Sequence, residues 1–147
     1  MKNLFQGLAI NKLFFSFWIS LAIIFIGIDQ VTKLVATRFG WSIFLNDQFA
    51  FSLPVPVFLM YTIYVAILVG MSVYVYRTWE RFANIQKLAW VFVYSGGVSN
   101  IIERVILGHV RDFIPISSGI LNVADFFILF GLVLLLVSNR YSKNNEQ

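Results

Sequence analysis

Residues 55–76 read VPVFLMYTIYVAILVGMSVYVY and contain no charged side chain. A membrane-spanning helix needs about 20 consecutive, mostly apolar residues, and this run is long enough by itself. The whole chain is 59% hydrophobic and only 12% charged, whereas about a quarter of the residues of an average soluble protein are charged. The sequence therefore predicts an all-α membrane protein rather than a soluble domain.

Three other apolar runs are shorter, at 13–28, 88–102 and 126–139. To cross a bilayer, each must extend into the charged residues that flank it. We therefore expect one domain over residues 1–147 with four transmembrane helices, at about 13–36, 55–76, 87–107 and 122–140. The acids that then lie inside the membrane or at its edge are Asp29, Glu103 and Asp125. Such acids are expensive to bury, which makes them candidates for function.

The basic residues predict an orientation for these helices. Four spans place both termini on one side, with seven of the 11 Lys and Arg residues, and four on the other. This bias favours cytoplasmic termini and a cytoplasmic tail at 141–147. The loop at 39–54, between the first and second spans, then lies outside the cytoplasm. Its alternation of apolar and polar residues predicts a small β or loop element there.

Composition also excludes several kinds of chemistry. The net charge of +4 comes from scattered residues that form no basic stripe, so no nucleic-acid partner is predicted. The chain has no cysteine, which excludes disulfides, thiol catalysis and thiolate metal sites. A single histidine, His109, predicts no metal site and is interpreted as structural.

Two aspartates are the strongest candidates for catalysis. Asp112 lies in the stretch 108–113, and Asp125 directly precedes the last apolar run. Pro115 and Gly119 between them predict a turn, so the chain can fold back and bring both carboxyl groups to one membrane face. Two carboxyl groups held close together cannot both ionise readily, which suits them to share a proton and activate water.

Both aspartates also have simpler explanations. Asn122 is a favoured helix N-cap, and Asp125 would lie near the positive end of the helix dipole. Asp112 could form a surface salt bridge with Arg111 or Arg104. Arg111 is the poorer partner, because adjacent residues on a strand point to opposite faces. The residues alone leave these alternatives open.

The third apolar run carries a polar stripe. Gly96, Asn100 and Arg104 are spaced four residues apart and share one helix face. Glycine permits close packing of membrane helices, whereas Asn and Arg can donate hydrogen bonds to carboxylates or to a substrate backbone. Glu103, beside Arg104, is interpreted as neutralising a basic partner.

The first apolar run ends in two opposite charges. Asp29 and Lys33 are four residues apart, so they can pair along one helix face. The simplest interpretation is an ion pair on the helix surface, at the membrane interface, where the span ends.

Together these motifs resemble the signal peptidase II family, the lipoprotein signal peptidases, which are four-helix membrane aspartyl peptidases. The resemblance covers nearly the whole chain, and it depends on the order and spacing of the motifs more than on any one of them. The motifs are Asp29-Gln30-x-x-Lys33, Asn46-x-x-x-Ala50-Phe51, Gly96-Gly97-x-Ser99-Asn100-x-x-Glu103-Arg104, Val110-x-Asp112-Phe113 and Asn122-x-Ala124-Asp125.

The resemblance implies an enzyme that removes signal peptides from diacylglyceryl-modified prolipoproteins. Asp112 and Asp125 would form the catalytic pair, with one acting as general base on a water and the other polarising the scissile carbonyl. The residues expected to bind substrate or support the site are Asp29, Lys33, Asn46, Gly96, Asn100, Arg104, Asn122 and Ala124. The expected partners are the prolipoprotein and membrane lipid. We expect a monomer without a cofactor in the bacterial cytoplasmic (inner) membrane, with its active site near the outer face.

Three residues depart from the family pattern. Gln48 replaces an outer-loop glycine, Ser99 stands where glycine is usual, and Glu103 replaces an aspartate. Two other functions remain to be tested, and these departures motivate the first of them. One is a catalytically inactive relative that binds lipoproteins or lipids. The other is a small proton- or ion-conducting membrane protein that uses Asp29, Glu103 and Asp125 as relay sites.

Overall fold

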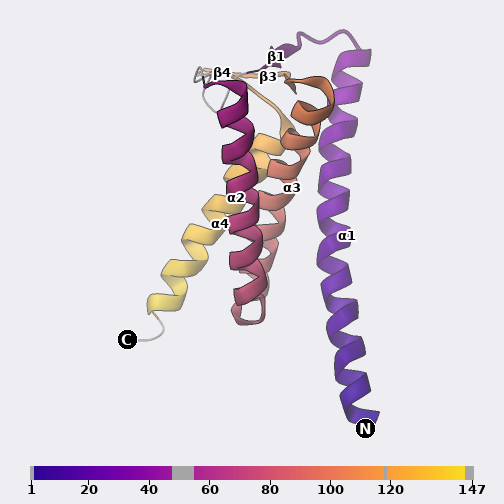
Figure 1. The fold of residues 1–147 in the computed structure, drawn as a ribbon, viewed down its shortest axis with the longest axis vertical. Coiled ribbons are helices and arrows are strands. Elements are labelled where there is room, and N and C mark those ends of the chain that lie inside the picture. The colour runs from indigo at the N-terminus through magenta and orange to yellow at the C-terminus, as the bar shows by residue number, and fades with distance from the viewer. Residues whose placement is uncertain (1, 48–54, 118, 145–147) are drawn as a thin grey trace.

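The computed structural model describes residues 2–47, 55–117 and 119–144, and side chains from residue 16 to residue 140 within those ranges. The elements, in chain order, are α1 Lys2–Arg38, β1 Phe44–Asn46, α2 Val57–Thr78, the 3-10 turn η2 Trp79–Arg81, α3 Asn84–Leu107, β2 Val110–Asp112, β3 Ile114–Ile116, β4 Gly119–Leu121 and α4 Val123–Asn144. The long helices run alongside one another, and the short strands gather at one end (Figure 1). The first turns of α1 and the last turns of α4 lie toward the other end.

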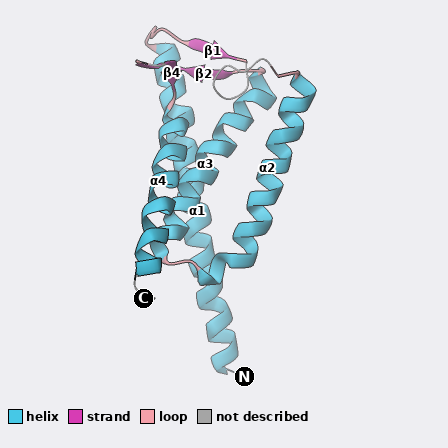
Figure 2. Ribbon diagram, turned by 90° about the vertical axis from the view of Figure 1, so that its left-hand side faces the viewer, coloured by secondary structure: helices cyan, strands magenta, loops and turns pink. Residues whose placement is uncertain are grey.

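The strands form two small antiparallel pairs that cap the helices (Figure 2). β1 pairs with β2, with Phe44 opposite Asp112 and Asn46 opposite Val110. The β element expected between the first two helices is therefore only half of a sheet, because its partner strand follows α3. The turn predicted from Pro115 and Gly119 is confirmed as the hairpin of β3 and β4.

A glycine at the end of α3 directs the chain into β2. Gly108 adopts a left-handed conformation with φ 79°, and its N–H donates to the carbonyl of Arg104 at 3.0 Å. This is a common way for a helix to end, because glycine takes positive φ without steric penalty. It sets the start of the strand that carries Asp112.

Three helical segments are long and apolar enough to cross a membrane, namely Ser16–Arg38, Val57–Arg81 and Val123–Arg140. Among the described helices, α3 does not meet this criterion, since it carries Lys87, Asn100, Glu103 and Arg104. All four of these side chains are buried, and α3 packs against both α1 and α4. The polar composition of α3 thus fits a helix that faces protein on several sides.

Glycines allow α3 and α4 to approach closely. A Cβ at Gly96 would collide with the backbone carbonyl of Ala124, and a Cβ at Gly131 would lie 2.6 Å from the carbonyl oxygen of Ala89. Each helix thus places a glycine against the backbone of the other. Small residues at such positions are typical of packed membrane helices.

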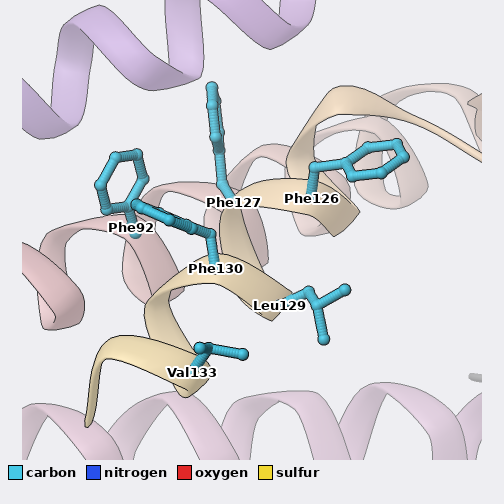
Figure 3. A pocket seen from close by; sticks show the side chains of 6 residues that line it. All are labelled: Phe92, Phe126, Phe127, Leu129, Phe130 and Val133. Carbon is cyan, nitrogen blue, oxygen red and sulfur yellow. The ribbon is translucent and has the colours of Figure 1, made fainter. Parts of the chain in front are cut away.

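An aromatic cluster joins α1 to this helix pair. The ring of Phe25 stacks on Phe92 with centroids 4.5 Å apart and lies 5.1 Å from the ring of Phe127. Beside this cluster is an apolar hollow, in which Phe92 and Phe127 point toward α1 and away from Leu129 and Val133 (Figure 3). Its lining residues are Phe92, Phe126, Phe127, Leu129, Phe130 and Val133.

Candidate active site

Asp29 and Lys33 form an ion pair inside the bundle, not on its surface. Lys33 Nζ lies 2.8 Å from Asp29 Oδ2, and both side chains are completely buried. The other carboxylate oxygen of Asp29 accepts from the backbone N–H of Ala124 at 2.8 Å, at the start of α4. The predicted pairing is confirmed, but its placement on the helix surface was wrong. Helical spacing predicts which residues share a face, not which face neighbouring helices cover.

Lys33 also connects α1 to α3 through two further acceptors. Its Nζ lies 2.9 Å from Glu103 Oε2 and donates to Asn100 Oδ1 at 2.9 Å. With its oxygen engaged by Lys33, the amide of Asn100 directs its nitrogen the other way. That Nδ2 donates to Asp125 Oδ1 at 2.9 Å. A continuous hydrogen-bonded path therefore runs from Lys33 to Asp125.

Asp125 lies in the first turn of α4, in a reciprocal arrangement with Asn122. The backbone N–H of Asp125 donates to Asn122 Oδ1 at 3.1 Å, and the backbone N–H of Asn122 donates to Asp125 Oδ2 at 3.0 Å. This geometry is a capping box, in which the side chain of each residue accepts a hydrogen bond from the backbone N–H of the other. Two N–H groups at the start of the helix thereby gain a partner. The prediction that Asn122 caps this helix is confirmed. Capping fixes the Asp125 carboxyl group in place.

Asp112 is held by two side-chain amides. Asn122 Nδ2 donates to Asp112 Oδ1 at 2.6 Å, and Asn46 Nδ2 donates to Asp112 Oδ2 at 3.0 Å. Asn46 reaches this position because β1 pairs with β2. The side chain of Asp112 is 2% exposed, and this burial raises the pKa of its carboxyl group, although the two amide donors act in the opposite direction.

The two candidate catalytic carboxyl groups therefore share one neighbour. Asn122 donates to Asp112 through its side chain and to Asp125 through its backbone. The chain folds back through the hairpin of β3 and β4 between β2 and α4, as the turn predicted. Asp112 therefore ends the strand before this hairpin, and Asp125 lies in the first turn of the helix after it.

The remaining predicted site residues lie around this pair. Ala124 is completely buried where Gly96 packs against it. The guanidinium of Arg104 lies 5.3 Å from the ring centre of Tyr64, and its backbone carbonyl accepts from the hydroxyl of Tyr61 at 2.7 Å. The polar stripe on α3 therefore divides, with Asn100 facing α4 and Arg104 contacting α2. Gln48, Ala50 and Phe51 of the outer loop lie outside the described residues.

The structure adds residues that the sequence did not place at the site. Glu103 Oε1 lies 2.6 Å from Arg111 Nε and 2.5 Å from Arg111 Nη2. Arg111 therefore pairs with Glu103, and the interpretation of Glu103 as a neutralising partner is confirmed. Ser99 donates from Oγ to Asp29 Oδ2 at 2.7 Å and accepts from Gln30 Nε2 at 2.9 Å. In the sequence, the opposite charges of Glu103 and Arg111 on either side of Gly108, where α3 ends, were the signal that could have indicated this pair.

The donor atoms at this site suit carboxyl groups more than a metal. Amide nitrogens of Asn46, Asn100 and Asn122 surround the two aspartates. Among the residues that the structure describes, no group of three or more His, Cys, Asp or Glu side chains is arranged to hold a metal ion.

Fold and site together define a helical membrane protein with a pair of carboxyl groups, Asp112 and Asp125, that accept hydrogen bonds from asparagine side-chain amides, and Asp112 is buried. The model of the family described as signal peptidase (SPase) II matches residues 21–140. The chain therefore belongs to the signal peptidase II family, and it is a membrane peptidase of the signal-peptide-cleaving class.

Individual relatives agree with this assignment. A lipoprotein signal peptidase of Janthinobacterium sp. (strain Marseille) is 26% identical over an alignment of 156 positions, which covers 88% of this chain and 94% of the relative. A lipoprotein signal peptidase of Streptococcus thermophilus (strain CNRZ 1066) is 29% identical over 120 residues, covering 76% of this chain and 75% of the relative. A solved structure described as a bacterial membrane enzyme has the same fold, with a TM-score of 0.76 at 21% identity, covering 90% of this chain and 92% of that one.

Proposed function

We propose that this chain is an aspartic endopeptidase that removes signal peptides from diacylglyceryl-modified prolipoproteins. Its membership of the signal peptidase II family supports the reaction class. The observation that supports the aspartic chemistry is the arrangement of Asp112 and Asp125, whose carboxyl groups both accept hydrogen bonds from Asn122. The lipidated substrate is suggested by the relatives that are named lipoprotein signal peptidases.

In the proposed reaction the two aspartates share one proton. The ionised member removes a proton from a water, whose oxygen attacks the scissile carbonyl carbon, while the protonated member donates to the carbonyl oxygen. When the tetrahedral intermediate collapses, the carbon–nitrogen bond breaks and the newly protonated carboxyl group delivers its proton to the leaving amine. The other carboxylate takes a proton back from a hydroxyl group of the intermediate, which becomes the new carboxyl group of the product. The two residues titrate as a unit, so the reaction returns them to one shared proton.

The neighbouring amides hold this pair in position. Asn122 and Asn46 donate to Asp112, and Asn100 donates to Asp125. Fixed donors reduce the movement that the carboxyl groups must make during the reaction. We assign Asp29 and Lys33 to the support of Asn100 and of the start of α4, and Arg104 to contact with the substrate backbone.

The proposed topology has four spans, cytoplasmic termini and an active site near the outer face of the membrane, in a monomer. It is supported by the excess of Lys and Arg on the side of the termini and by the position of the strands at the opposite end of the helices (Figure 1). The acyl chains of the substrate would lie along α4, just below Asp125. There Phe126, Leu129 and Phe130 are 41%, 57% and 51% exposed (Figure 3).

The proposal is tested with purified protein in detergent and a gel-shift assay. A diacylglyceryl-modified prolipoprotein is the substrate, and the same protein without the lipid is its matched control. We expect cleavage of the lipidated form alone. Equal cleavage of both forms would contradict the lipid requirement. No cleavage of either by folded protein would favour an inactive relative that only binds lipoproteins or lipids.

The ion-conducting alternative is tested in liposomes. Two of its three relay acids, Asp29 and Glu103, are paired with Lys33. Such ion pairs favour the ionised carboxylates and oppose the protonation that a proton relay needs. We expect no proton flux above that of empty liposomes at a protein density that supports cleavage. Flux that disappears with Asp125→Asn would contradict the peptidase proposal.

A further inference from the structure

Glu103 lies where α1, α3 and β2 meet, and both of its carboxylate oxygens are engaged. Oε1 lies between Nε and Nη2 of Arg111, at 2.6 and 2.5 Å. Oε2 accepts from the backbone N–H of Arg111 at 3.1 Å and lies 2.9 Å from Lys33 Nζ. One side chain therefore binds a strand through its backbone and its guanidinium, and a neighbouring helix through its lysine.

These contacts lead to both candidate catalytic carboxyl groups. Arg111 directly precedes Asp112 in β2, so its backbone N–H fixes the position of that strand. Lys33 donates to Asn100, which in turn donates to Asp125. Glu103 is therefore connected to Asp112 through Arg111, and to Asp125 through Lys33 and Asn100.

The strand that Glu103 binds is short. β2 has three residues, and its partner β1 has three as well. Two strands of this length are marginal by themselves in water. Charged partners form stronger hydrogen bonds than neutral ones, and the side chain of Glu103 is 1% exposed while that of Arg111 is 14% exposed. The Glu103 contacts are thus the charged anchor of this strand.

The length of the glutamate matters for this anchor. An aspartate at position 103 would be shorter by one methylene, about 1.5 Å of reach. It could not keep hydrogen bonds to both Lys33 and the Arg111 backbone without a shift of β2 or α1. The glutamate that departs from the family pattern and Arg111 therefore form a matched pair.

We propose that Glu103 and Arg111 are positioning residues that hold β2 against α3, so that the Asp112 carboxyl group stays in register with Asp125. The inference rests on the proposed aspartate-pair reaction. Neither residue needs to touch the substrate for this role. Misplacement of a reacting group by about 1 Å can reduce a rate a hundredfold, so loss of the anchor is expected to reduce turnover more than substrate binding.

The test measures kcat and KM for cleavage of a diacylglyceryl-modified prolipoprotein by Arg111→Met, Glu103→Asp and the double variant. We expect each single variant to lower kcat by about ten- to a hundredfold while KM changes by less than about threefold. The double variant is expected to lose less than the product of the two single losses, because both changes weaken the same contact between residues 103 and 111. Arg81→Met, at an exposed arginine in the 3-10 turn η2 that follows α2, is the matched control and keeps the wild-type kcat.

Two further measurements separate positioning from other roles. Arg111→Lys keeps the charge but cannot bind through Nε and Nη2 together, and we expect it to be impaired like Arg111→Met. An Arg111→Lys enzyme with the wild-type kcat would overturn the inference in favour of a charge effect. Losses that add in the double variant, or a kcat loss matched by a loss of folded protein in a thermal melt, would overturn it as well.

Asp112→Asn is measured in the same series. If it remains active, the proposed function fails, whatever the Glu103 variants do. If it is inactive while Arg111→Met turns over like the wild type, only the positioning role fails.

Discussion

The side-chain amide of Asn122 donates to Asp112 at 2.6 Å while the backbone N–H of the same residue donates to Asp125 at 3.0 Å. One residue thus performs a structural task, capping α4, and contacts both carboxyl groups of the proposed catalytic pair. The two tasks use different atoms, since the cap uses the side-chain oxygen and Asp112 binds the side-chain nitrogen. Substitutions can therefore separate them.

Asn122→Ser is expected to keep the helix cap and lose the donor to Asp112, because serine is as good an N-cap as asparagine but has no amide. Asn122→Ala loses both. A hydrogen bond to a charged group contributes about 1.5–3 kcal/mol, so we expect kcat to fall by about ten- to a hundredfold in both variants. Both variants should lose stability with this hydrogen bond, and Asn122→Ala should lose about 1 kcal/mol more because it also loses the cap. Steady-state kinetics beside thermal melts measure this, and equal stability loss in both variants would contradict the division of tasks.

The raised pKa of Asp112 predicts the pH dependence of cleavage. Burial favours the protonated form of this carboxyl group, and the reaction needs one ionised member in the pair. A raised pKa shifts the appearance of the ionised form to higher pH, so activity should fall as the pH drops through that raised value. The acid limb of kcat/KM against pH is expected above the ordinary aspartate value of about 4.

Asn46→Ala provides the directional test of this pH dependence. Asn46 donates to Asp112, and this hydrogen bond favours the ionised form. Its removal should move the acid limb further up in pH. An acid limb at the ordinary value in the wild type, or a downward shift in the variant, would show that Asp112 does not control it.

Adjacent glycines on α3 offer a matched test of helix packing. A Cβ at Gly96 would collide with the backbone of Ala124 and approach Ile128 Cγ1 at 2.8 Å, whereas a Cβ at Gly97 meets nothing within 4 Å. Overpacking of this kind costs about 1–3 kcal/mol. We expect Gly96→Ala to lower the melting temperature and impair cleavage by displacing Asp125. Gly97→Ala should behave like the wild type, and equal melting temperatures for the two variants would exclude this packing.

Ser99, one of the departures from the family pattern, supplies a hydroxyl to a buried carboxylate. It donates to Asp29 Oδ2 at 2.7 Å and is completely buried. We expect Ser99→Ala to destabilise the protein by about 1.5–3 kcal/mol, because the bond involves a charged group. Asp29 keeps Lys33 and the Ala124 amide, so kcat of the folded enzyme should change little.

Ser95→Ala is the control for Ser99→Ala. Ser95 is equally buried, but its hydroxyl donates only to backbone carbonyls of its own helix, at 2.8 and 3.1 Å. Its removal is expected to cost less, about 0.5–1.5 kcal/mol. Denaturation in a mild detergent would compare the two, and a smaller loss for Ser99→Ala would rule out the hydroxyl as an anchor for Asp29.

The sequence predicted well the features that depend on neighbouring residues. The cap at Asn122, the turn between Pro115 and Gly119 and the pairing of Asp29 with Lys33 all follow from local spacing, and the structure contains each of them. The same holds for the apolar run at 55–76, which corresponds closely to α2.

Features that depend on tertiary contacts were not predictable in this way. The partner of β1 lies 66 residues further along the chain, in β2, so nothing local indicates it. The burial of Asp29 and Lys33 depends on which face of α1 meets α3 and α4. Arg111 points to Glu103 because Gly108 reverses the chain between them, and opposite charges alone do not specify that geometry.

The central claim is that Asp112 and Asp125 together activate water. The most direct measurement is cleavage of a diacylglyceryl-modified prolipoprotein by Asp112→Asn and Asp125→Asn, each purified from membranes beside the wild type and Asp47→Asn, which changes an exposed aspartate beyond β1. The account predicts that both dyad variants insert and fold but do not cleave, while wild type and Asp47→Asn cleave at equal rates. Cleavage by a folded Asp125→Asn or Asp112→Asn enzyme at a rate near that of the wild type would contradict it.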